Sequence, residues 1–307
     1  MRNTTDVFAL ATGIDFIRCN RRIVEADGIL RMVSVSVVTA WKDRQELSTT
    51  LAENAPMLDR FGAQVILVNC GGNLDALRDI VGRSRLPVIL VNVHEAKFNK
   101  ALALNVGIHY ATSEYIFIID SDVIIPEETF ATCLSTACPN SLITIRRLRE
   151  TAGLSNVRWK SGGSLSDIVF RQLTSFMWSD GTETTVENYR HYSTDSSRGG
   201  QGQLLTSRQN LVNVNGYSSE LEGWGFEDID ILIRLQHLLG LKYLQIGEAT
   251  HISHGDEERC IASATKSINN RENAARAYRS YAEGLFHGTL TADVKSSRHS
   301  VLRIRKE

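Results

Sequence analysis

Apolar residues recur along the chain in short runs that are separated by amphipathic segments. β-Branched and aliphatic residues fill the runs, which is typical of buried strands. Between the runs, apolar residues fall at helical spacing. The expected strands span 33–39, 65–68, 87–91 and 115–119, and the expected helices run from about 45, over 74–81 and over 97–110. Because strand and helix alternate, we expect an α/β fold with a mostly parallel central sheet and helices on both faces.

The pattern changes in the second half of the chain. Residues 146–200 are rich in Ser, Thr and Gly, carry scattered aromatic residues and predict an irregular excursion. Long irregular segments inside a domain are usually functional or disordered, and the aromatic residues favour a binding role. The regular elements expected around it are helices over 127–138, 208–213, 227–240 and 267–286, and strands over 142–145, 202–207 and 241–246.

Asp120 and Asp122 follow directly after the apolar run 115–119. Open α/β sheets bind ligands just outside the carboxyl ends of their strands, so both carboxylates are expected at such an edge. Hard oxygen ligands suit Mg²⁺ or Mn²⁺, usually shared with substrate phosphates. A single Asp-x-Asp is more often a turn that closes a strand, so the motif needs support from the rest of the chain.

Glu227 and Asp228 open the helix expected over 227–240. Asp228 shares a helical face with Ile231 and the leucines that follow, so it continues the buried stripe at the helix N-terminus. A carboxylate held there beside a cleft is placed to accept a proton. The alternative is that both acids only complement the helix dipole. Asp230 and Arg234 lie elsewhere and are expected to form an exposed i,i+4 pair.

Two further clusters add chemistry to the second half. Gly223 and Gly225 flank Trp224 and let the backbone present an indole face, a common platform for sugar rings. His251 and His254 follow a later apolar run. Two histidines three residues apart can ligate a metal through neutral imidazole nitrogens, although a lone histidine is more often structural.

The composition is that of an ordinary soluble protein. The chain has 307 residues, is 42% apolar and 22% charged, and carries a formal net charge of −1, which gives no reason to expect nucleic acid or an anionic membrane as a partner. No window approaches the roughly 18 apolar residues of a membrane span, and the N-terminus lacks the layout of a signal peptide. Five scattered cysteines indicate buried thiols in a reducing compartment, so we expect a cytoplasmic protein.

Four motifs occur in order along the chain. They are residues 98–107 (Phe-Asn-Lys-Ala-Leu-Ala-Leu-Asn-Val-Gly), 120–122 (Asp-Ser-Asp), 215–217 (Asn-Gly-Tyr) and 223–230 (Gly-Trp-Gly-Phe-Glu-Asp-Ile-Asp). Together they resemble the metal-dependent glycosyltransferases of the nucleotide-sugar-binding GT-A fold, most closely the β-1,4-galactosyltransferase family and related family 2 bacterial enzymes. The resemblance spans roughly residues 33–255.

The resemblance implies one GT-A catalytic domain over 32–255. Its nucleotide-sugar half would be 32–126 and its acceptor and catalytic half 127–255, including the excursion at 146–200. Residues 1–31 would be an N-terminal extension. Residues 256–307 would be a C-terminal helical tail, through which a homodimer is a further hypothesis.

The resemblance also implies a role for each matching residue. Asp228 would be the general base, with Glu227 as its catalytic neighbour. The metal ion, Mn²⁺ or Mg²⁺, would be held by Asp122, His254, His251 and Asp120. The UDP-sugar donor would contact Ala40, Trp41, Lys42, Arg44, Asn69, Phe98, Lys100, Asp120, Ser121 and Gly202. The acceptor would contact Trp224, Gly225, Phe226 and Glu227.

Some positions depart from the family pattern. Lys100 stands where the family carries arginine. A lysine ammonium acts as a point charge and cannot give the diphosphate the two parallel hydrogen bonds of a guanidinium group. Asn69 and Cys70 stand where related enzymes carry acidic residues that hold the nucleoside. Phe226 replaces a glycine beside the acceptor and should narrow or reshape that site.

The expected function is therefore that of a metal-dependent inverting glycosyltransferase, which moves a sugar from a UDP-sugar to a hydroxyl of an unidentified glycan, peptide or natural product. Two alternatives stay open. A sugar-phosphate nucleotidyltransferase shares the α/β plan and the metal carboxylates, but no Gly-rich basic loop follows the first strand here. A retaining or non-catalytic GT-A relative is the other.

Overall fold

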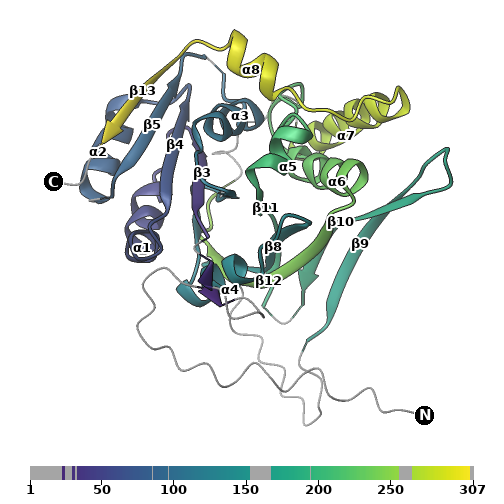
Figure 1. Cartoon of the computed structure of the whole chain (residues 1–307), viewed down its shortest axis with the longest axis horizontal. Coiled ribbons are helices and arrows are strands. Elements are labelled where there is room, and N and C mark those ends of the chain that lie inside the picture. Colours follow the sequence, from purple (N-terminus) through teal and green to yellow (C-terminus); the bar gives the residue numbers. More distant parts are fainter. Residues whose placement is uncertain are drawn as a thin grey trace.

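A computed structural model describes residues 23–24, 30–31, 33–84, 86–95, 97–152, 167–193, 195–255 and 265–304. An eleven-stranded sheet crosses the molecule, and helices cover both of its faces (Figure 1). A separate two-stranded sheet pairs β1 (Ile23–Val24) with β2 (Leu30–Arg31). Residues 1–22, which make up most of the expected N-terminal extension, lie outside the described residues.

The first half of the large sheet is parallel, as the alternating pattern predicts. Its strands are β3 (Val35–Trp41), β4 (Gln64–Cys70), β5 (Val88–Val93) and β6 (Tyr115–Ile118). The helices between them are α1 (Glu46–Arg60), α2 (Leu74–Ser84) and α3 (Lys100–Tyr110). The strands lie in the order β5-β4-β3-β6, and each neighbouring pair is parallel. Pro56 lies inside α1 without ending it.

The second half makes the sheet mixed. Its elements are β7 (Val123–Ile124), α4 (Glu127–Thr136), β8 (Ser141–Glu150), β11 (Arg198–Ser207), α5 (Arg208–Asn213), α6 (Glu227–Leu239) and β12 (Lys242–His251). The order continues β6-β11-β8-β12-β7. Only β8 and β12 are parallel among these neighbours, and the other pairs are antiparallel.

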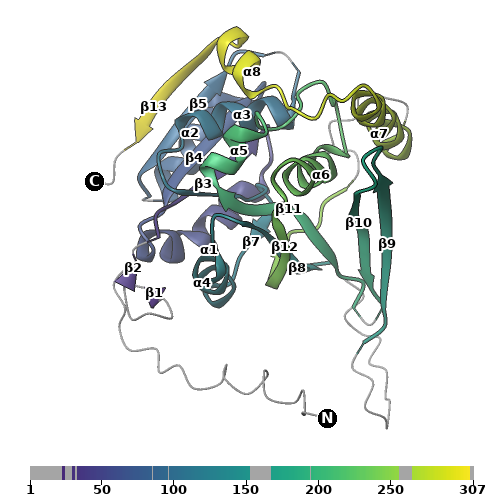
Figure 2. The ribbon, with the colours of Figure 1, turned by 45° about the vertical axis from the view of Figure 1, so that its right-hand side comes forward.

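Where the structure describes it, the segment 146–200 is largely regular, which corrects the predicted irregular excursion. It contains the end of β8 and a long hairpin of β9 (Val169–Met177) and β10 (Glu183–Tyr192), which joins the sheet through β11. Most of β9 is exposed on both faces. The strand therefore has no alternation of apolar and polar residues from which it could be recognised. Figure 2 shows the hairpin beside α6, with its turn near helix α7 (Lys266–Ala282).

The C-terminal segment contains the expected helix and also completes the sheet. After α7 come α8 (Leu290–Ser296) and β13 (His299–Ile304). β13 pairs antiparallel with β5 along its whole length. It thereby covers an edge whose backbone groups would otherwise be free to pair with another chain.

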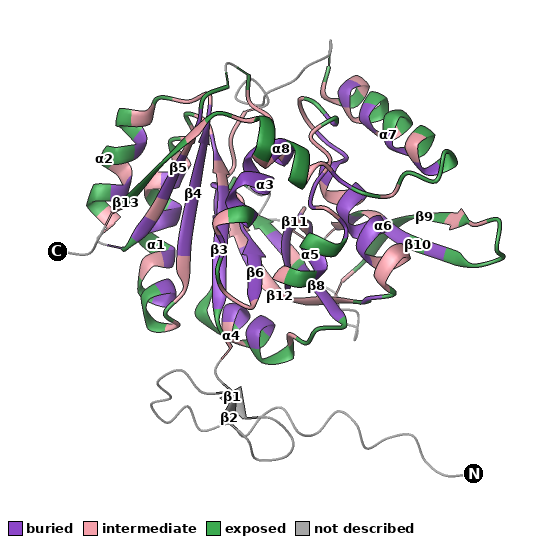
Figure 3. Ribbon diagram, turned by 45° about the horizontal axis from the view of Figure 1, so that its top comes forward, coloured by how far each residue is buried: buried purple, intermediate pink, exposed green. Residues whose placement is uncertain are grey.

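The core forms two layers, one on each face of the sheet. On one face, α3 and α6 bury Leu104, Ile108 and Ile231. On the other, α1, α2 and α4 bury residues such as Leu77 and Phe130. Figure 3 shows that the buried residues concentrate in the central strands and in the helix faces turned toward them.

The Asn-Val-Gly motif of α3 serves the fold. A Cβ on Gly107 would come within 2.4 Å of Val38 Cγ1, so only glycine lets α3 lie this close to β3. The Asn105 amide donates to the Tyr217 carbonyl at 2.9 Å and to Asp293 Oδ2 at 2.6 Å, and its oxygen accepts from the Tyr217 N–H at 2.7 Å. These bonds fix α3 to the loop before α6 and to α8.

Two expectations from the composition, on membrane spans and on the cysteines, can be compared with the structure. Among the described residues, none of the helices combines the length and apolar character that a membrane span requires. Cys70 and Cys133 are buried thiols, but Cys138 is exposed, which corrects the expectation of buried thiols at that position. Cys19 and Cys260 lie outside the described residues.

Candidate active site

A cleft of about 380 Å³ opens at the carboxyl ends of β3 and β6 and at the start of α6. Fifteen of the predicted site residues line it: Ala40, Lys42, Arg44, Phe98, Lys100, Asp120, Ser121, Asp122, Gly202, Trp224, Gly225, Phe226, Glu227, Asp228 and His251. The structure thus gathers residues from both halves of the chain around one cavity, at the sheet edge where α/β proteins bind ligands.

Trp41 and Asn69, both predicted to contact the donor, are not among the residues that line this cleft. Trp41 is buried, and its indole N–H donates to the Arg44 carbonyl at 2.8 Å. The Asn69 amide donates to the Gly72 carbonyl at 2.9 Å, and its oxygen accepts from the Gly72 N–H at 2.9 Å. Both side chains shape the loops beside the cleft.

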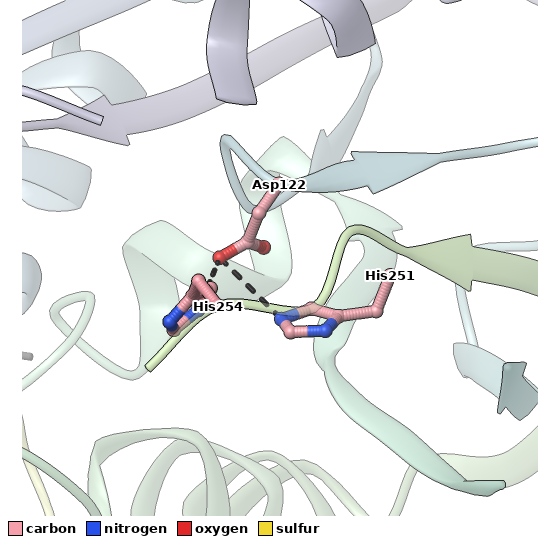
Figure 4. A group of neighbouring side chains, drawn as sticks. All are labelled: Asp122, His251 and His254. Carbon is pink, nitrogen blue, oxygen red and sulfur yellow. Dashed lines mark ion pairs between the residues drawn. The ribbon is translucent and has the colours of Figure 1, made fainter. Parts of the chain in front are cut away.

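Asp122, His251 and His254 form a compact group of possible metal ligands. The Nε2 atoms of His251 and His254 lie 3.5 Å and 3.3 Å from the same Asp122 oxygen, Oδ2 (Figure 4). One ligand atom from each residue lies within 4.8 Å of the others. Asp122 follows β6, His251 ends β12 and His254 comes just after it, so the group depends on the packing of distant segments.

The imidazoles are oriented to present lone pairs to a cation. His251 Nδ1 lies 2.6 Å from Glu150 Oε2, so a proton on Nδ1 leaves Nε2 free to act as a ligand. His254 Nδ1 likewise lies 2.9 Å from the Gly255 carbonyl. His254 Nε2 is buried and has no hydrogen-bond partner of good geometry in the part of the chain that the structure describes. The Asp122 carboxylate and the two imidazole nitrogens therefore form a set of three ligands that fits a divalent cation.

The charges at this group favour a cation as well. Burial alone would raise the pKa of Asp122, but the close contacts and the charge of both histidines hold it far below its usual range. Burial would lower the pKa of His251, but its bonds to Asp122 and Glu150 raise it to about 9. A positive charge is therefore strongly favoured at this point, whether carried by a proton or by a metal.

Asp120 lies outside this group, although it was predicted as a fourth ligand. Lys100 Nζ lies 3.0 Å from its Oδ1, and the Gln203 amide donates to its Oδ2 at 2.7 Å. A Cβ on Gly202 would come within 2.8 Å of Asp120 Oδ2 and 2.9 Å of Asp228 Oδ2. The glycine therefore allows these two carboxylates to approach each other across β11.

Lys100 joins the acids at the base of the cleft. Its Nζ lies 3.1 Å from both oxygens of Asp228 and 3.5 Å from Glu227 Oε1. Burial would lower the pKa of Lys100, but Asp120, Asp228 and Glu227 raise it well above its ordinary value. The amine stays charged and holds three carboxylates together that would otherwise repel each other.

Asp228 has the ionisation expected of a base that works near neutral pH. Burial raises its pKa, Lys100 opposes this, and the charges of Glu227 and Asp120 add to the rise, so that the pKa reaches about 7. In neutral solution a carboxyl group of this pKa is about half ionised, so it is available as a base and still binds a proton well.

The turn into α6 is held in an unusual conformation. Gly223 and Gly225 have φ of 75° and 96°, and Phe226, which is not glycine, has φ of 75°. The side chain of Asn273 in α7 donates to the carbonyls of Glu222 and Gly225 at 3.0 Å and 2.8 Å. Helix α7 thus stabilises the backbone that places the first acids of α6 at the cleft.

Asp230 and Arg234 are buried, which corrects the prediction of a surface pair. Asp230 is 3% exposed and Arg234 1%. Arg234 donates to Asp230 Oδ2 from two nitrogens at 3.0 Å and 2.6 Å, and Tyr281 of α7 donates to Asp230 Oδ1 at 2.5 Å. The helical pattern of α6 could not reveal this burial, because α7 comes from a later part of the chain.

Several residues that line the cleft were not predicted from the sequence. They are Asn188, Tyr189, Arg198, Gly199, Gln201, Gln203, Ile229, Lys266 and Asn270. Glu150, which supports His251, was not predicted either. Most lie on β10, β11 and α7, where no motif marks them. The aromatic content of 146–200 was the one signal that pointed toward Tyr189.

Comparisons with known proteins bear on the fold and the family. The sequence model of the family described as glycosyltransferase like family 2 matches residues 36–257. The crystal structure of GalNAc-T7 with UDP, GalNAc and Mn²⁺ gives a TM-score of 0.53 at 12% identity, covering 80% of this chain and 48% of that one. The chain thus spans about half the length of that protein.

The mannosyltransferase PcManGT from Pyrobaculum calidifontis, in complex with GDP-Man and Mn²⁺, gives a TM-score of 0.50 at 13% identity, covering 85% of this chain and 68% of that one. At these identities the likeness shows a shared fold, and it confirms the predicted GT-A architecture. No match was found among curated proteins. Because the family model matches most of the chain, this protein belongs to glycosyltransferase like family 2.

Proposed function

We propose that this protein is a metal-dependent inverting glycosyltransferase that moves a sugar from a UDP-sugar to an acceptor hydroxyl. The observation that carries the proposal is the composition of one cleft. It places Asp228, with a pKa of about 7, in the same cavity as Asp122 and His251, two members of the candidate metal group.

The donor half of the cleft suits a nucleotide diphosphate. Lys42 and Arg44 line it and supply positive charge for phosphate oxygens, whereas the charge of Lys100 is balanced by the neighbouring acids. GalNAc-T7 was crystallised with UDP, whereas PcManGT was crystallised with GDP-Man. The Asn69 side chain is engaged in its own turn, so we propose that the loops around Ala40 and Phe98 select the base.

The candidate metal group favours Mn²⁺ over Mg²⁺. Its three residues supply two imidazole nitrogens and one carboxylate. Imidazole ligands favour transition-metal ions, whereas Mg²⁺ prefers oxygen ligands. When bound, the cation would supply positive charge to the diphosphate that leaves the sugar.

The residues of the cleft perform the remaining steps. Asp228 accepts the proton of the acceptor hydroxyl as its oxygen attacks the anomeric carbon, while the bond to the diphosphate breaks and UDP departs. Lys100 holds the Asp228 carboxylate through both of its oxygens. Trp224 and Glu227 line the same cavity, and we propose that they contact the acceptor. Attack opposite the leaving group inverts the anomeric configuration.

The substitution Asp228→Asn tests this proposal. It keeps the size of the side chain and removes its basicity, so sugar transfer should fall by about 10²–10⁴-fold, while UDP binding measured by calorimetry stays near that of the wild type. NMR of the product should show an anomeric configuration opposite to that of the donor. Retention of configuration, or release of pyrophosphate in place of UDP, would overturn the proposal.

A further inference from the structure

We propose that the face of the β9–β10 hairpin that carries Phe170, Tyr189 and His191 binds an oligosaccharide acceptor whose reacting end enters the cleft. The inference rests on the proposed function and extends it by naming the class of acceptor.

Tyr189 connects the hairpin to the cleft. It lines the cavity and is 49% exposed. Its ring is nearly parallel to that of His191, with an interplanar angle of 7° and centroids 6.4 Å apart. His191 pairs with Phe170 across the hairpin, and Phe170 is 60% exposed. Because paired residues of antiparallel strands point to the same face, the three rings form a row that begins at the cleft.

The row lies on the side of β9 that faces the body of the protein. Phe176 is on the same face of this strand as Phe170, since their positions differ by an even number of residues. The ring of Phe176 packs against Tyr278 and Tyr281 of α7, with centroids 5.7 Å and 5.9 Å apart. The opposite face of β9 carries Leu173 and Met177, so a substitution on that face can serve as a control.

Polar groups beside the rings indicate a ligand rich in hydroxyls. Asn188 Oδ1, Gln201 Nε2 and Gln203 Oε1 are buried atoms without a hydrogen-bond partner within the described ranges, and all three residues line the cleft. Gln172 is exposed and pairs with Tyr189. Sugar hydroxyls both donate and accept, whereas an apolar ligand would leave these amides unsatisfied.

Aromatic rings complement this polar set. Exposed rings offer a flat apolar surface to the C–H face of a pyranose, and each such contact makes a modest favourable contribution to the free energy of binding. Several rings in a row therefore suit a chain of sugars better than a single sugar. The combination of stacked rings and unsatisfied amides favours an oligosaccharide over an apolar peptide.

The test uses the full chain with Mn²⁺ and UDP on an array of linear oligosaccharides with glucose, N-acetylglucosamine or galactose units, each series in increasing length. We expect binding to at least one series, with affinity rising with length. Phe170→Ala and His191→Ala should each weaken binding of the longest member about tenfold. Leu173→Ala removes a side chain that is 58% exposed on the other face of β9 and should leave binding unchanged.

Absence of binding to every series would overturn the inference, as would an equal loss of binding in Leu173→Ala. Thermal unfolding of each variant verifies that the hairpin remains folded. Hydrolysis of UDP-sugars by the wild type without acceptor reports separately on the proposed function. Hydrolysis without oligosaccharide binding would refute the acceptor inference alone. Binding without turnover of any nucleotide sugar, with or without acceptor, would refute the proposed function alone.

Discussion

Gly202 sets how closely Asp120 and Asp228 approach each other. Alanine can adopt its backbone conformation, but the added Cβ would lie 2.8 Å and 2.9 Å from the two carboxylates and displace them. We expect Gly202→Ala to lower the kcat/KM for sugar transfer about 10–100-fold with little change in the thermal midpoint, because small displacements of catalytic groups are costly. Gly82→Ala in α2, where a Cβ meets no atom within 4 Å, is the control and should remain fully active. Full activity of Gly202→Ala would show that the carboxylate geometry is not critical.

The ionisation of Asp228 predicts the pH dependence of transfer. Its pKa is raised from 3.8 to about 7 in the folded protein, so the carboxylate that we propose as the base becomes protonated as the pH falls below about 7. The kcat/KM should therefore rise about tenfold per pH unit up to about pH 7 and level off above it. Lys100→Met removes the cation that lowers the Asp228 pKa and should move the inflection to higher pH. A profile without an inflection near neutral pH would contradict the assignment.

The raised pKa of Asp228 also makes the stability of the fold depend on pH. A carboxyl group with a raised folded-state pKa binds its proton more tightly in the folded than in the unfolded protein. Asp228 therefore contributes stability at low pH that is lost as the pH rises from about 4 to 7. Such an acid destabilises the resting fold in neutral solution, which is typical of a functional rather than a structural carboxylate.

At the scale of elements, α6 depends on a buried ion pair. Arg234→Met leaves the Asp230 charge buried beside Tyr281 without its cation. We expect the free energy of unfolding to fall by about 3–5 kcal/mol in urea titrations. The exposed pair of Arg78 and Asp75 in α2 supplies the control, since Arg78→Met should cost less than about 1 kcal/mol. Equal small losses in both variants would mean that Arg234 does not stabilise α6.

The limits of sequence-based prediction also lie at the level of elements. The parallel strands β3 to β6 could be predicted because burial on both faces produces continuous apolar runs. The β9–β10 hairpin could not, because β9 is exposed on both faces. The burial of Asp230 depends on α7, and the support of His251 depends on Glu150 at the end of β8. Such contacts leave no local pattern in the sequence.

At the scale of the whole molecule, the fold assembles one site from separate motifs. Asp122 and Asp228 were identified as candidates within their own segments, and the cleft contains both. The position of Asp120 could not be anticipated, because it depends on Lys100 from α3 and Gln203 from β11. The C-terminal segment covers the edge of the sheet through β13 and supports the loop before α6 through α7. A homodimer through this segment stays a prediction.

The most direct test of the central claim is the affinity for Mn²⁺, measured by electron paramagnetic resonance of the free ion in the presence of UDP. The wild type should bind one ion per chain. Asp122→Ala and His254→Ala should abolish detectable binding, and Glu150→Gln should weaken it about 10–100-fold through His251. Asp120→Asn should retain the affinity, since Asp120 bonds Lys100 and Gln203. Unchanged binding in His254→Ala, or its loss in Asp120→Asn alone, would contradict the proposed site.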